Sequence, residues 1–170
     1  MKIGIMSDSH DSIFNLKKAI DLCLKEKVEI IFHCGDLISP FMIPILGEFK
    51  GEVHLILGNN PGDIFLLMQK ISEYSNIKFY GESAFLEVIG CKIAMVHYPK
   101  IAYLLAKSRE YDFVFCGHTH KYEVKKINNT LVINPGEILG KEGLPSFVIL
   151  DLKTKEYQKI YIKGVYNAVE

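Results

Sequence analysis

The stretch "KIGIMSDSHDSIFNLKKAIDLCLKEK", Lys2 to Lys27, sets the pattern of the fold. The short apolar run "KIGIM" predicts a buried strand. After a polar turn, apolar residues recur at helical spacing: Ile13, Leu16, Ile20 and Leu24. This spacing predicts an amphipathic helix, with Asp11 or Ser12 as its N-cap.

The same alternation continues along the chain. "EIIFHC" (29–34) and "EVHLIL" (52–57) read as two further strands, and helices are expected near 41–49 and 64–74. Strands that alternate with helices in this way predict a parallel sheet with right-handed crossovers.

After Asn76 the pattern changes to closely spaced strands, at 84–90, 91–98, 112–117, 122–127, 130–136, 146–152 and 157–163. "NNTLV" and "DLKTKEY" predict hairpin turns, and one helix is expected near 101–108. About ten strands are too many for one sheet. We therefore expect a single α/β domain, residues 1–170, in which two sheets pack face to face with helices outside.

Composition limits the partners. Lys plus Arg and Asp plus Glu both number 20, and this zero net charge disfavours a nucleic-acid or anionic membrane surface as partner. No apolar stretch approaches the roughly 20 residues of a membrane helix, and the N-terminal apolar run is too short for a signal peptide. Four scattered cysteines without C-x-x-C are expected to be reduced thiols in a cytoplasmic protein.

Polar residues typical of metal ligands follow five of the predicted strands: Asp8 and His10; Asp36; Asn59; His97; His118 and His120. Ligands of open α/β sheets bind beyond the carboxyl ends of the strands. In extended backbone, residues i and i+2 point the same way, so each D-x-H or H-x-H pair is expected to aim two donors together. Gly35, Gly58 and Gly117 precede these groups and permit close approach of the backbone.

Each motif alone has an ordinary interpretation. A single D-x-H is typical of chance or of a helix cap, and G-D and G-N are common turn dipeptides. His97 alone would be a core histidine with a hydrogen-bond partner. Their combination at five strand ends instead predicts a metal site.

In the order D-x-H, G-D, G-N, His and G-H-x-H, these motifs resemble the signature of the calcineurin-like metallophosphoesterases. The chain looks most like the small single-domain phosphodiesterases of archaea and bacteria, and its tail, "INPGEILG" and "LPSFVILDL", resembles that branch too. The resemblance implies a four-layer α-β-β-α sandwich. It also implies two divalent ions, one held by Asp8, His10 and His120 and one by Asn59, His97 and His118, with Asp36 bridging both.

The resemblance further implies hydrolysis of small phosphodiesters, by in-line attack of a hydroxide that bridges the two metals. The expected catalytic residues are Asp36, Asn59, Asn60 and His97. Imidazole and oxygen ligands without thiolate suit Mn, Fe, Ni or Zn, with Mg as a further option, and Mn²⁺ is the expected activating ion. The competing hypothesis is a catalytically weak scaffold or sensor on the same fold that acts through a protein partner. The complete set of expected ligands favours the enzyme.

Two motifs depart from the family pattern. In "GNNPGD", Asn60 replaces a histidine that many members use near the leaving group, so the general acid is unassigned and acidic leaving groups are expected to react best. In "VHYPK", Tyr98 and Pro99 replace glycine and histidine. Tyr98 either reshapes the substrate pocket or packs on the surface, and the sequence favours neither.

Other residues carry weaker predictions. Asp11 and Asn15 are candidates for orienting His10, and Asn134 either supports the site or forms a turn. Glu137 matches the small archaeal members. His33 and His54 are expected to be structural, while Lys100 and Lys121 are candidate phosphate contacts. Tyr103 and Leu104 are expected to be exposed apolar residues that would allow a homodimer.

Overall fold

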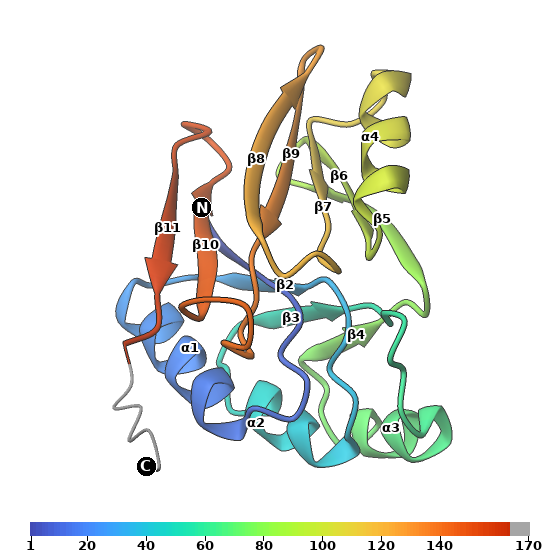
Figure 1. Cartoon of the computed structure of the whole chain (residues 1–170), viewed down its shortest axis with the longest axis vertical. Coiled ribbons are helices and arrows are strands. Elements are labelled where there is room, and N and C mark those ends of the chain that lie inside the picture. Colours follow the sequence, from blue (N-terminus) through green and yellow to red (C-terminus); the bar gives the residue numbers. More distant parts are fainter. Residues whose placement is uncertain (164–170) are drawn as a thin grey trace.

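Two β-sheets face one another in the structure, a computed structural model that describes residues 1–163 (Figure 1). In chain order the elements are β1 (Lys2–Met6), α1 (Ile13–Lys25), β2 (Ile30–His33), the 3-10 turn η1 (Pro40–Met42), α2 (Ile43–Gly47), β3 (Glu52–Leu55), α3 (Ile64–Ile71), β4 (Ile77–Phe79), β5 (Ser83–Val88), β6 (Cys91–Val96), α4 (Pro99–Ser108), β7 (Phe113–Phe115), β8 (Tyr122–Ile127), β9 (Thr130–Pro135), β10 (Ser146–Asp151) and β11 (Tyr157–Tyr161). Residues 164–170, part of the expected domain, lie outside this description.

Both sheets are mixed. The first has the order β11-β10-β1-β2-β3-β4 and the second the order β5-β6-β7-β9-β8. Strands β1 to β4 run parallel, as the alternation of strands and helices predicts, and α1, α2 and α3 cover their outer face (Figure 1). Helix α4 covers the outer face of the second sheet, where β6, β7 and β9 are parallel. The predicted four-layer α-β-β-α sandwich is confirmed.

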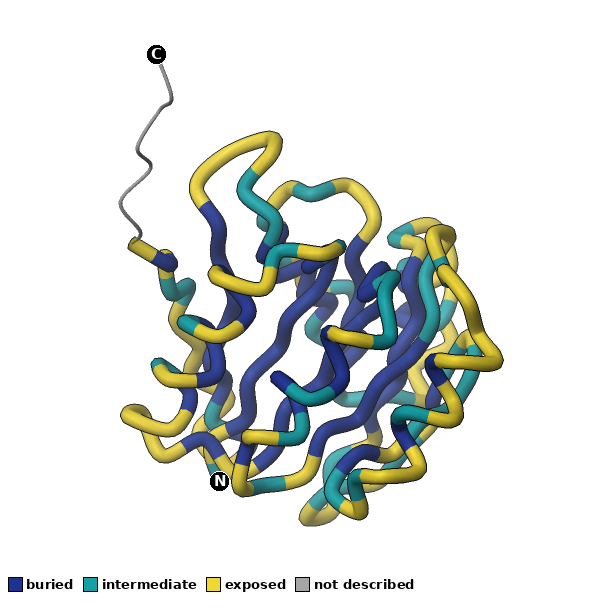
Figure 2. Tube along the Cα trace, turned by 90° about the horizontal axis from the view of Figure 1, so that it is seen from below, coloured by how far each residue is buried: buried dark blue, intermediate teal, exposed yellow. Residues whose placement is uncertain are grey.

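The core lies in three apolar layers, and the central one holds the sheets together. Phe32 from the first sheet and Phe115 from the second meet there, edge to face, with ring centroids 5.3 Å apart. Complete burial of one such side chain contributes roughly 1.5–3 kcal/mol. The buried strands lie inside a rim of exposed loops (Figure 2). The loops that follow these strands therefore start from a rigid core.

Some predicted elements differ from the structure. The described residues contain eleven strands rather than about ten. The additional strand, β4, was not predicted because three residues are too few to establish a periodic pattern. The helix expected at 41–49 divides into η1, which begins at Pro40, and α2, because Pro44 within the segment lacks the N–H that a continuous helix would donate to the Pro40 carbonyl. Helix α3 ends at Ile71 rather than near 74, and α4 begins two residues early, at Pro99.

Of the two N-cap residues predicted for α1, the structure places Ser12 and not Asp11 at the cap position. Ser12 occupies the N-cap position, but its side chain makes no cap hydrogen bond. The Asp11 carboxylate instead accepts a hydrogen bond from the N–H of Ser39 (3.1 Å), which ties the start of α1 to the loop after β2. Asp11 therefore stabilises the contact between two loops.

Other predictions are confirmed. The hairpins β8–β9 and β10–β11 form where turn residues were recognised. Cys23, Cys34, Cys91 and Cys116 are free thiols. Among residues 1–163, none of the helices combines the length and the apolar character that crossing a membrane requires.

Candidate metal centre

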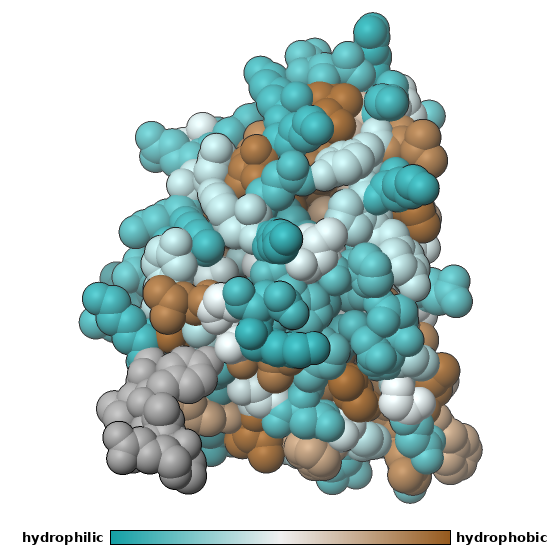
Figure 3. Space-filling model, viewed as in Figure 1, coloured by the Kyte–Doolittle hydropathy of each residue, from teal (hydrophilic) through white to brown (hydrophobic). Residues whose placement is uncertain are grey.

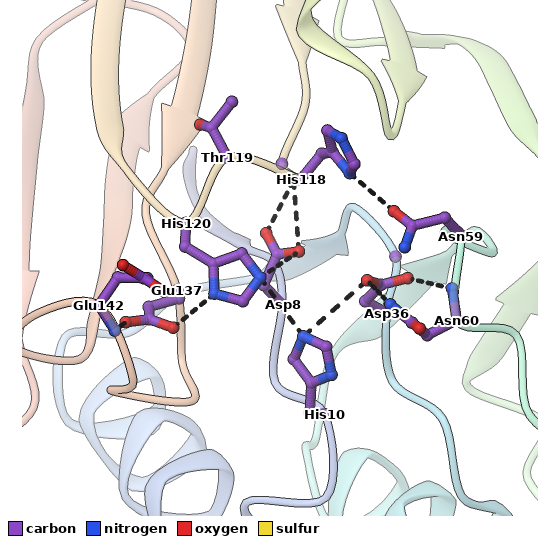
Figure 4. Close-up of polar contacts among 12 residues, drawn as sticks. Asp8, His10, Asp36, Asn59, Asn60, His118, Thr119, His120, Glu137 and Glu142 are labelled. Atoms are coloured by element: carbon purple, nitrogen blue, oxygen red, sulfur yellow. Dashed lines mark hydrogen bonds and ion pairs between the residues drawn. The ribbon is translucent and has the colours of Figure 1, made fainter.

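The seven predicted ligands lie on loops that meet between the two sheets. Backbone hydrogen bonds join these loops: the Asp8 N–H donates to the Gly35 carbonyl (3.1 Å) and the His10 N–H to the Asp36 carbonyl (2.8 Å). In the second sheet, the Gly117 N–H donates to the His97 carbonyl (3.0 Å). Figure 4 shows side chains from these loops pointing toward one another.

The backbone turns these side chains inward in a way that the sequence argument did not anticipate. Positive φ angles occur at five of the predicted ligands: Asp8 (52°), His10 (45°), Asp36 (54°), His118 (70°) and His120 (60°). The expectation of extended backbone in D-x-H and H-x-H is therefore wrong. Left-handed conformations of non-glycine residues cost of order 1–3 kcal/mol each and concentrate at functional sites.

Two glycines permit the close approach of these loops, as predicted. A Cβ at Gly58 would lie 2.0 Å from Oδ1 of Asp36. At Gly117, a Cβ would lie 1.9 Å from Oγ of Ser7 and 2.7 Å from Oδ2 of Asp8. Any side chain at either position would displace a carboxylate of the site.

Asp8, His10 and His120 form a first cluster, in which one donor atom from each lies within 4.8 Å of the others. Nε2 of His120 is 3.4 Å from Nε2 of His10 and 3.6 Å from Oδ1 of Asp8. On the opposite side of the His120 ring, Nδ1 lies 2.7 Å from the buried Glu137 carboxylate. Because Nδ1–H donates to this carboxylate, Nε2 presents a lone pair to the cluster.

Asp8, Asp36 and His97 form a second cluster that shares Asp8 with the first. Nε2 of His97 lies 3.6 Å from Asp36 Oδ2 and 3.9 Å from Asp8 Oδ1. Nδ1 of His97 lies 2.8 Å from the carbonyl oxygen of Cys34, so this nitrogen carries the proton and Nε2 is free to coordinate. The Cys34 carbonyl thus fixes the tautomer of His97, as the Glu137 carboxylate fixes the tautomer of His120.

Asn59 and His118 lie at the exposed edge of the second cluster. Oδ1 of Asn59 is 3.0 Å from Nε2 of His97 and 2.7 Å from Nδ1 of His118. The His118 N–H also donates to the Asp8 carboxylate (3.0 Å to Oδ2). All seven predicted residues therefore belong to one connected group of donors.

The two carboxylates connect the clusters, because Asp8 belongs to both and Asp36 of the second cluster also approaches the first. Oδ2 of Asp36 is 3.9 Å from Nε2 of His10 in the first cluster and 3.6 Å from Nε2 of His97 in the second. Asn60 holds this carboxylate in place, because its N–H donates to Oδ1 (2.8 Å) and its amide nitrogen to Oδ2 (2.6 Å). The contact expected between Asn60 and the reacting phosphate stays a prediction.

The electrostatics of the site are suited to cations. Asp8 and Asp36 are buried, and within residues 1–163 their ion-pair partners are histidines. Burial raises the pKa of Asp8, and His97 opposes that shift. Two buried carboxylates beside imidazole nitrogens form a group of donors whose charge divalent cations would compensate. Imidazole, carboxylate and amide donors without thiolate fit Mn, Fe, Ni or Zn.

Several residues support these loops. Asn134 donates to the Gly117 carbonyl (2.7 Å) and to the Thr119 hydroxyl (3.0 Å), and its Oδ1 accepts the N–H of Gly136. Asn134 therefore fills both of its predicted roles, support of the site and turn formation. Asn15 donates to the carbonyls of Ile138 and Leu139 rather than to His10, so that prediction is wrong.

His33 and His54 have structural roles, as predicted. Nε2 of His33 bonds to Ser9 Oγ (2.9 Å), and complete burial lowers the pKa of His33 to about 3. His54 stacks on Phe32, with centroids 4.9 Å apart, and its Nδ1 lies 2.7 Å from the Tyr80 hydroxyl.

The remaining candidates lie at the edge of the site or beyond it. Tyr98 is 40% exposed, and its ring centroid lies 4.7 Å from that of His118 and 5.4 Å from that of His97. This contact with two candidate ligands favours its role in the pocket over simple surface packing. Lys100 and Lys121 are exposed, and their contact with phosphate stays a prediction. Tyr103 is half-buried rather than exposed, while Leu104 is exposed.

Sequence reasoning missed the groups that orient the ligands. Glu137 was noticed only as a match to the small archaeal members, because it contacts His120 from beyond the whole β8–β9 hairpin. The Cys34 carbonyl that fixes His97 belongs to the backbone, so no residue type could have marked it.

Comparison with known proteins defines the class. Residues 1–155 match the calcineurin-like phosphoesterase superfamily domain, so the chain belongs to this superfamily of hydrolases. It is 35% identical to phosphodiesterase MJ0936 of Methanocaldococcus jannaschii, over 96% of this chain and all of that protein. A solved archaeal phosphodiesterase, also 35% identical, superposes with a TM-score of 0.89 over 95% of this chain and 99% of that one.

Zinc-bound Vps29 from Entamoeba histolytica has the same fold. The two chains are 16% identical, with a TM-score of 0.66 over 96% of this chain and 100% of that one. At this identity the likeness concerns the fold alone.

Proposed function

We propose that the protein is a dinuclear metal-dependent phosphodiesterase that hydrolyses small phosphodiesters. The observation that carries this proposal is the pair of donor clusters that share Asp8, with Asp36 of the second cluster also 3.9 Å from His10 of the first. The similarity to MJ0936, a phosphodiesterase, supports the substrate class. The metal ligands are Asp8, His10, Asp36, Asn59, His97, His118 and His120, with Mn²⁺ as the expected activating ion in vitro. Because its four cysteines are free, we place the enzyme in the reducing cytoplasm.

When bound, two divalent ions lower the pKa of water and stabilise charge that develops on phosphorus. The protein fixes where that chemistry takes place. Glu137 and the Cys34 carbonyl hold protons on Nδ1 of His120 and His97, so both rings keep a lone pair toward the site. Asn60 orients Asp36 but cannot protonate a leaving group. The reaction therefore depends on the acidity of the departing alcohol.

The test is hydrolysis of bis(4-nitrophenyl) phosphate by metal-stripped protein, before and after addition of Mn²⁺, Ni²⁺, Zn²⁺ or Mg²⁺. We expect metal-dependent turnover that Asp36→Asn lowers by more than the roughly 10–100-fold cost of losing a residue that only orients a ligand. The matched control is Asp21→Asn on the exposed face of α1, which should leave turnover unchanged.

Absence of turnover with all four ions would overturn the proposal. The donor clusters would then hold metal for structure or sensing, and a protein partner would be sought instead. Equal turnover by Asp36→Asn and the wild type would remove Asp36 from the mechanism.

A further inference from the structure

A cavity of about 480 Å³ opens directly beside the donor clusters. Asn59 and His97 belong to both features, because they line the cavity while Asn59 Oδ1 and His97 Nε2 meet in the site at 3.0 Å. The cavity lies between the loop after β3, the start of β5 and the first turns of α4. Its volume is in the range of small-molecule pockets. A phosphate bound at the clusters would have one ester group adjacent to this cavity.

The walls of the cavity are mainly apolar. Six side chains supply this surface: Leu57, Pro61, Phe85, Val96, Ile101 and Leu105. Phe85 is 56% exposed and Ile101 45% exposed, so apolar surface is left open to solvent at the site itself. Hydrophobic residues are also visible along the edge of the molecule near α4 (Figure 3). Exposed apolar surface of this kind marks ligand-binding grooves.

Charge limits what the cavity can take. Glu82 lines it, and the residues that line it, all within the described part of the chain, include no lysine or arginine. A second phosphate or a carboxylate there would lie near Glu82 without a compensating cation, which is unfavourable. An uncharged group meets no such penalty. Two aromatic rings, Phe85 and Tyr98, line the cavity and favour a flat aromatic occupant.

We infer that this cavity binds an uncharged aromatic ester group of the phosphodiester. This inference rests on the proposed function, since the clusters must first hold the phosphate. It narrows the substrate class to diesters in which at least one substituent is an aromatic ring system, and it disfavours diesters whose two substituents are both charged or small and polar. It also assigns Tyr98 to the wall between the cavity and the donor clusters.

The test compares two diesters whose leaving groups are less acidic than 4-nitrophenol, used as competitors of 4-nitrophenyl methyl phosphate hydrolysis by the metal-loaded enzyme. Diphenyl phosphate supplies aromatic groups, and dimethyl phosphate carries the same charge without them. Burial of one ring predicts that diphenyl phosphate binds about tenfold more tightly or better. We define the ring preference as the ratio of the two inhibition constants, measured within each protein so that a general loss of activity cancels.

Ile101→Asp places a charge on the wall and is expected to reduce the ring preference to within about threefold of unity. Leu104→Asp is the matched control, because Leu104 is 65% exposed on the same helix and does not line the cavity. The control should keep the wild-type ratio. Phe85→Ser changes the part of the wall that β5 supplies, so the test can still be made if one of the two variants does not fold.

Different results would overturn the cavity assignment and the proposed function. A wild-type ratio near unity, or an unchanged ratio in both Ile101→Asp and Phe85→Ser, would overturn the cavity assignment while leaving metal-dependent hydrolysis intact. If no metal supports turnover, calorimetry of diphenyl phosphate binding to wild type and Ile101→Asp replaces the inhibition assay. A preference lost in Ile101→Asp would then support the cavity although the proposed function had failed.

Discussion

Replacement of Glu137 by glutamine tests how the site fixes one of its histidines. The buried carboxylate accepts three hydrogen bonds, from Nδ1–H of His120 and from the N–H groups of Glu142 and Gly143. Glutamine has the same shape but only one acceptor oxygen. If that oxygen keeps the two backbone N–H groups, the amide NH₂ faces His120. Nδ1 must then accept, and the proton moves to Nε2.

A proton on Nε2 removes the lone pair that His120 presents toward Asp8 and His10. If the glutamine turns the other way, His120 keeps its tautomer but two N–H groups of the 142–143 loop face a donor. Loss of a group that orients a ligand costs about 10–100-fold in metal affinity, which corresponds to about 1.4–2.8 kcal/mol. The unpaired N–H groups destabilise the metal-free protein by roughly 1–3 kcal/mol.

Calorimetric titration of metal-stripped protein with Mn²⁺ measures the first effect. We expect Glu137→Gln to weaken one of two binding events, while Glu142→Gln, an exposed change on the same loop, behaves as wild type. The ¹⁵N NMR spectrum of His120 reports the tautomer separately. Wild-type affinity for both ions in Glu137→Gln would refute the assignment of Glu137 as the residue that positions His120.

Three further predictions follow from the same contacts. Gly58→Ala places a carbon 2.0 Å from Asp36 Oδ1 and is expected to lower the free energy of unfolding of the metal-free protein by about 1–3 kcal/mol, measured by denaturant titration. Gly143→Ala is the control, because the added carbon there meets nothing within 4 Å. Burial lowers the pKa of His33 to about 3, so as pH falls below 6.5 this histidine is protonated in the unfolded chain but not in the folded one, and the free energy of unfolding falls. Between pH 7 and 5 the wild type should lose about 2 kcal/mol more of this free energy than His33→Gln. An equal loss in both proteins would contradict this prediction. Without a proton from Asn60, dialkyl diesters should react about 10²–10⁴-fold more slowly than aryl diesters in steady-state assays, and comparable rates would show that another general acid operates.

Much of the fold was readable from the sequence because its signals are local. Apolar runs and helical spacing locate β1, α1, β2 and β3, and the parallel arrangement follows from their alternation. The strand β4 was not readable, because its three residues are too few to establish a pattern and it forms by pairing with β3. The helix after β2 was misjudged where its prolines interrupt it.

The candidate site was predicted from residue types at strand ends, and the structure brings all seven of these residues together. Their position after strand ends was predicted correctly, but the expectation of extended backbone within each pair was wrong, because Asp8 and His120 adopt left-handed conformations that a sequence pattern does not reveal. The orientation of His97 by the Cys34 carbonyl is a tertiary contact between different sheets. Sequence therefore indicates which side chains converge, while the loops determine how they are oriented.

The central claim is that this chain holds two ions that act together. The most direct measurement is a titration of metal-stripped protein with Mn²⁺, in which hydrolysis of bis(4-nitrophenyl) phosphate and metal bound per chain are followed in the same samples. We expect turnover to reach its maximum as the second equivalent of Mn²⁺ binds. Full activity at one equivalent, or two bound ions without turnover, would contradict it.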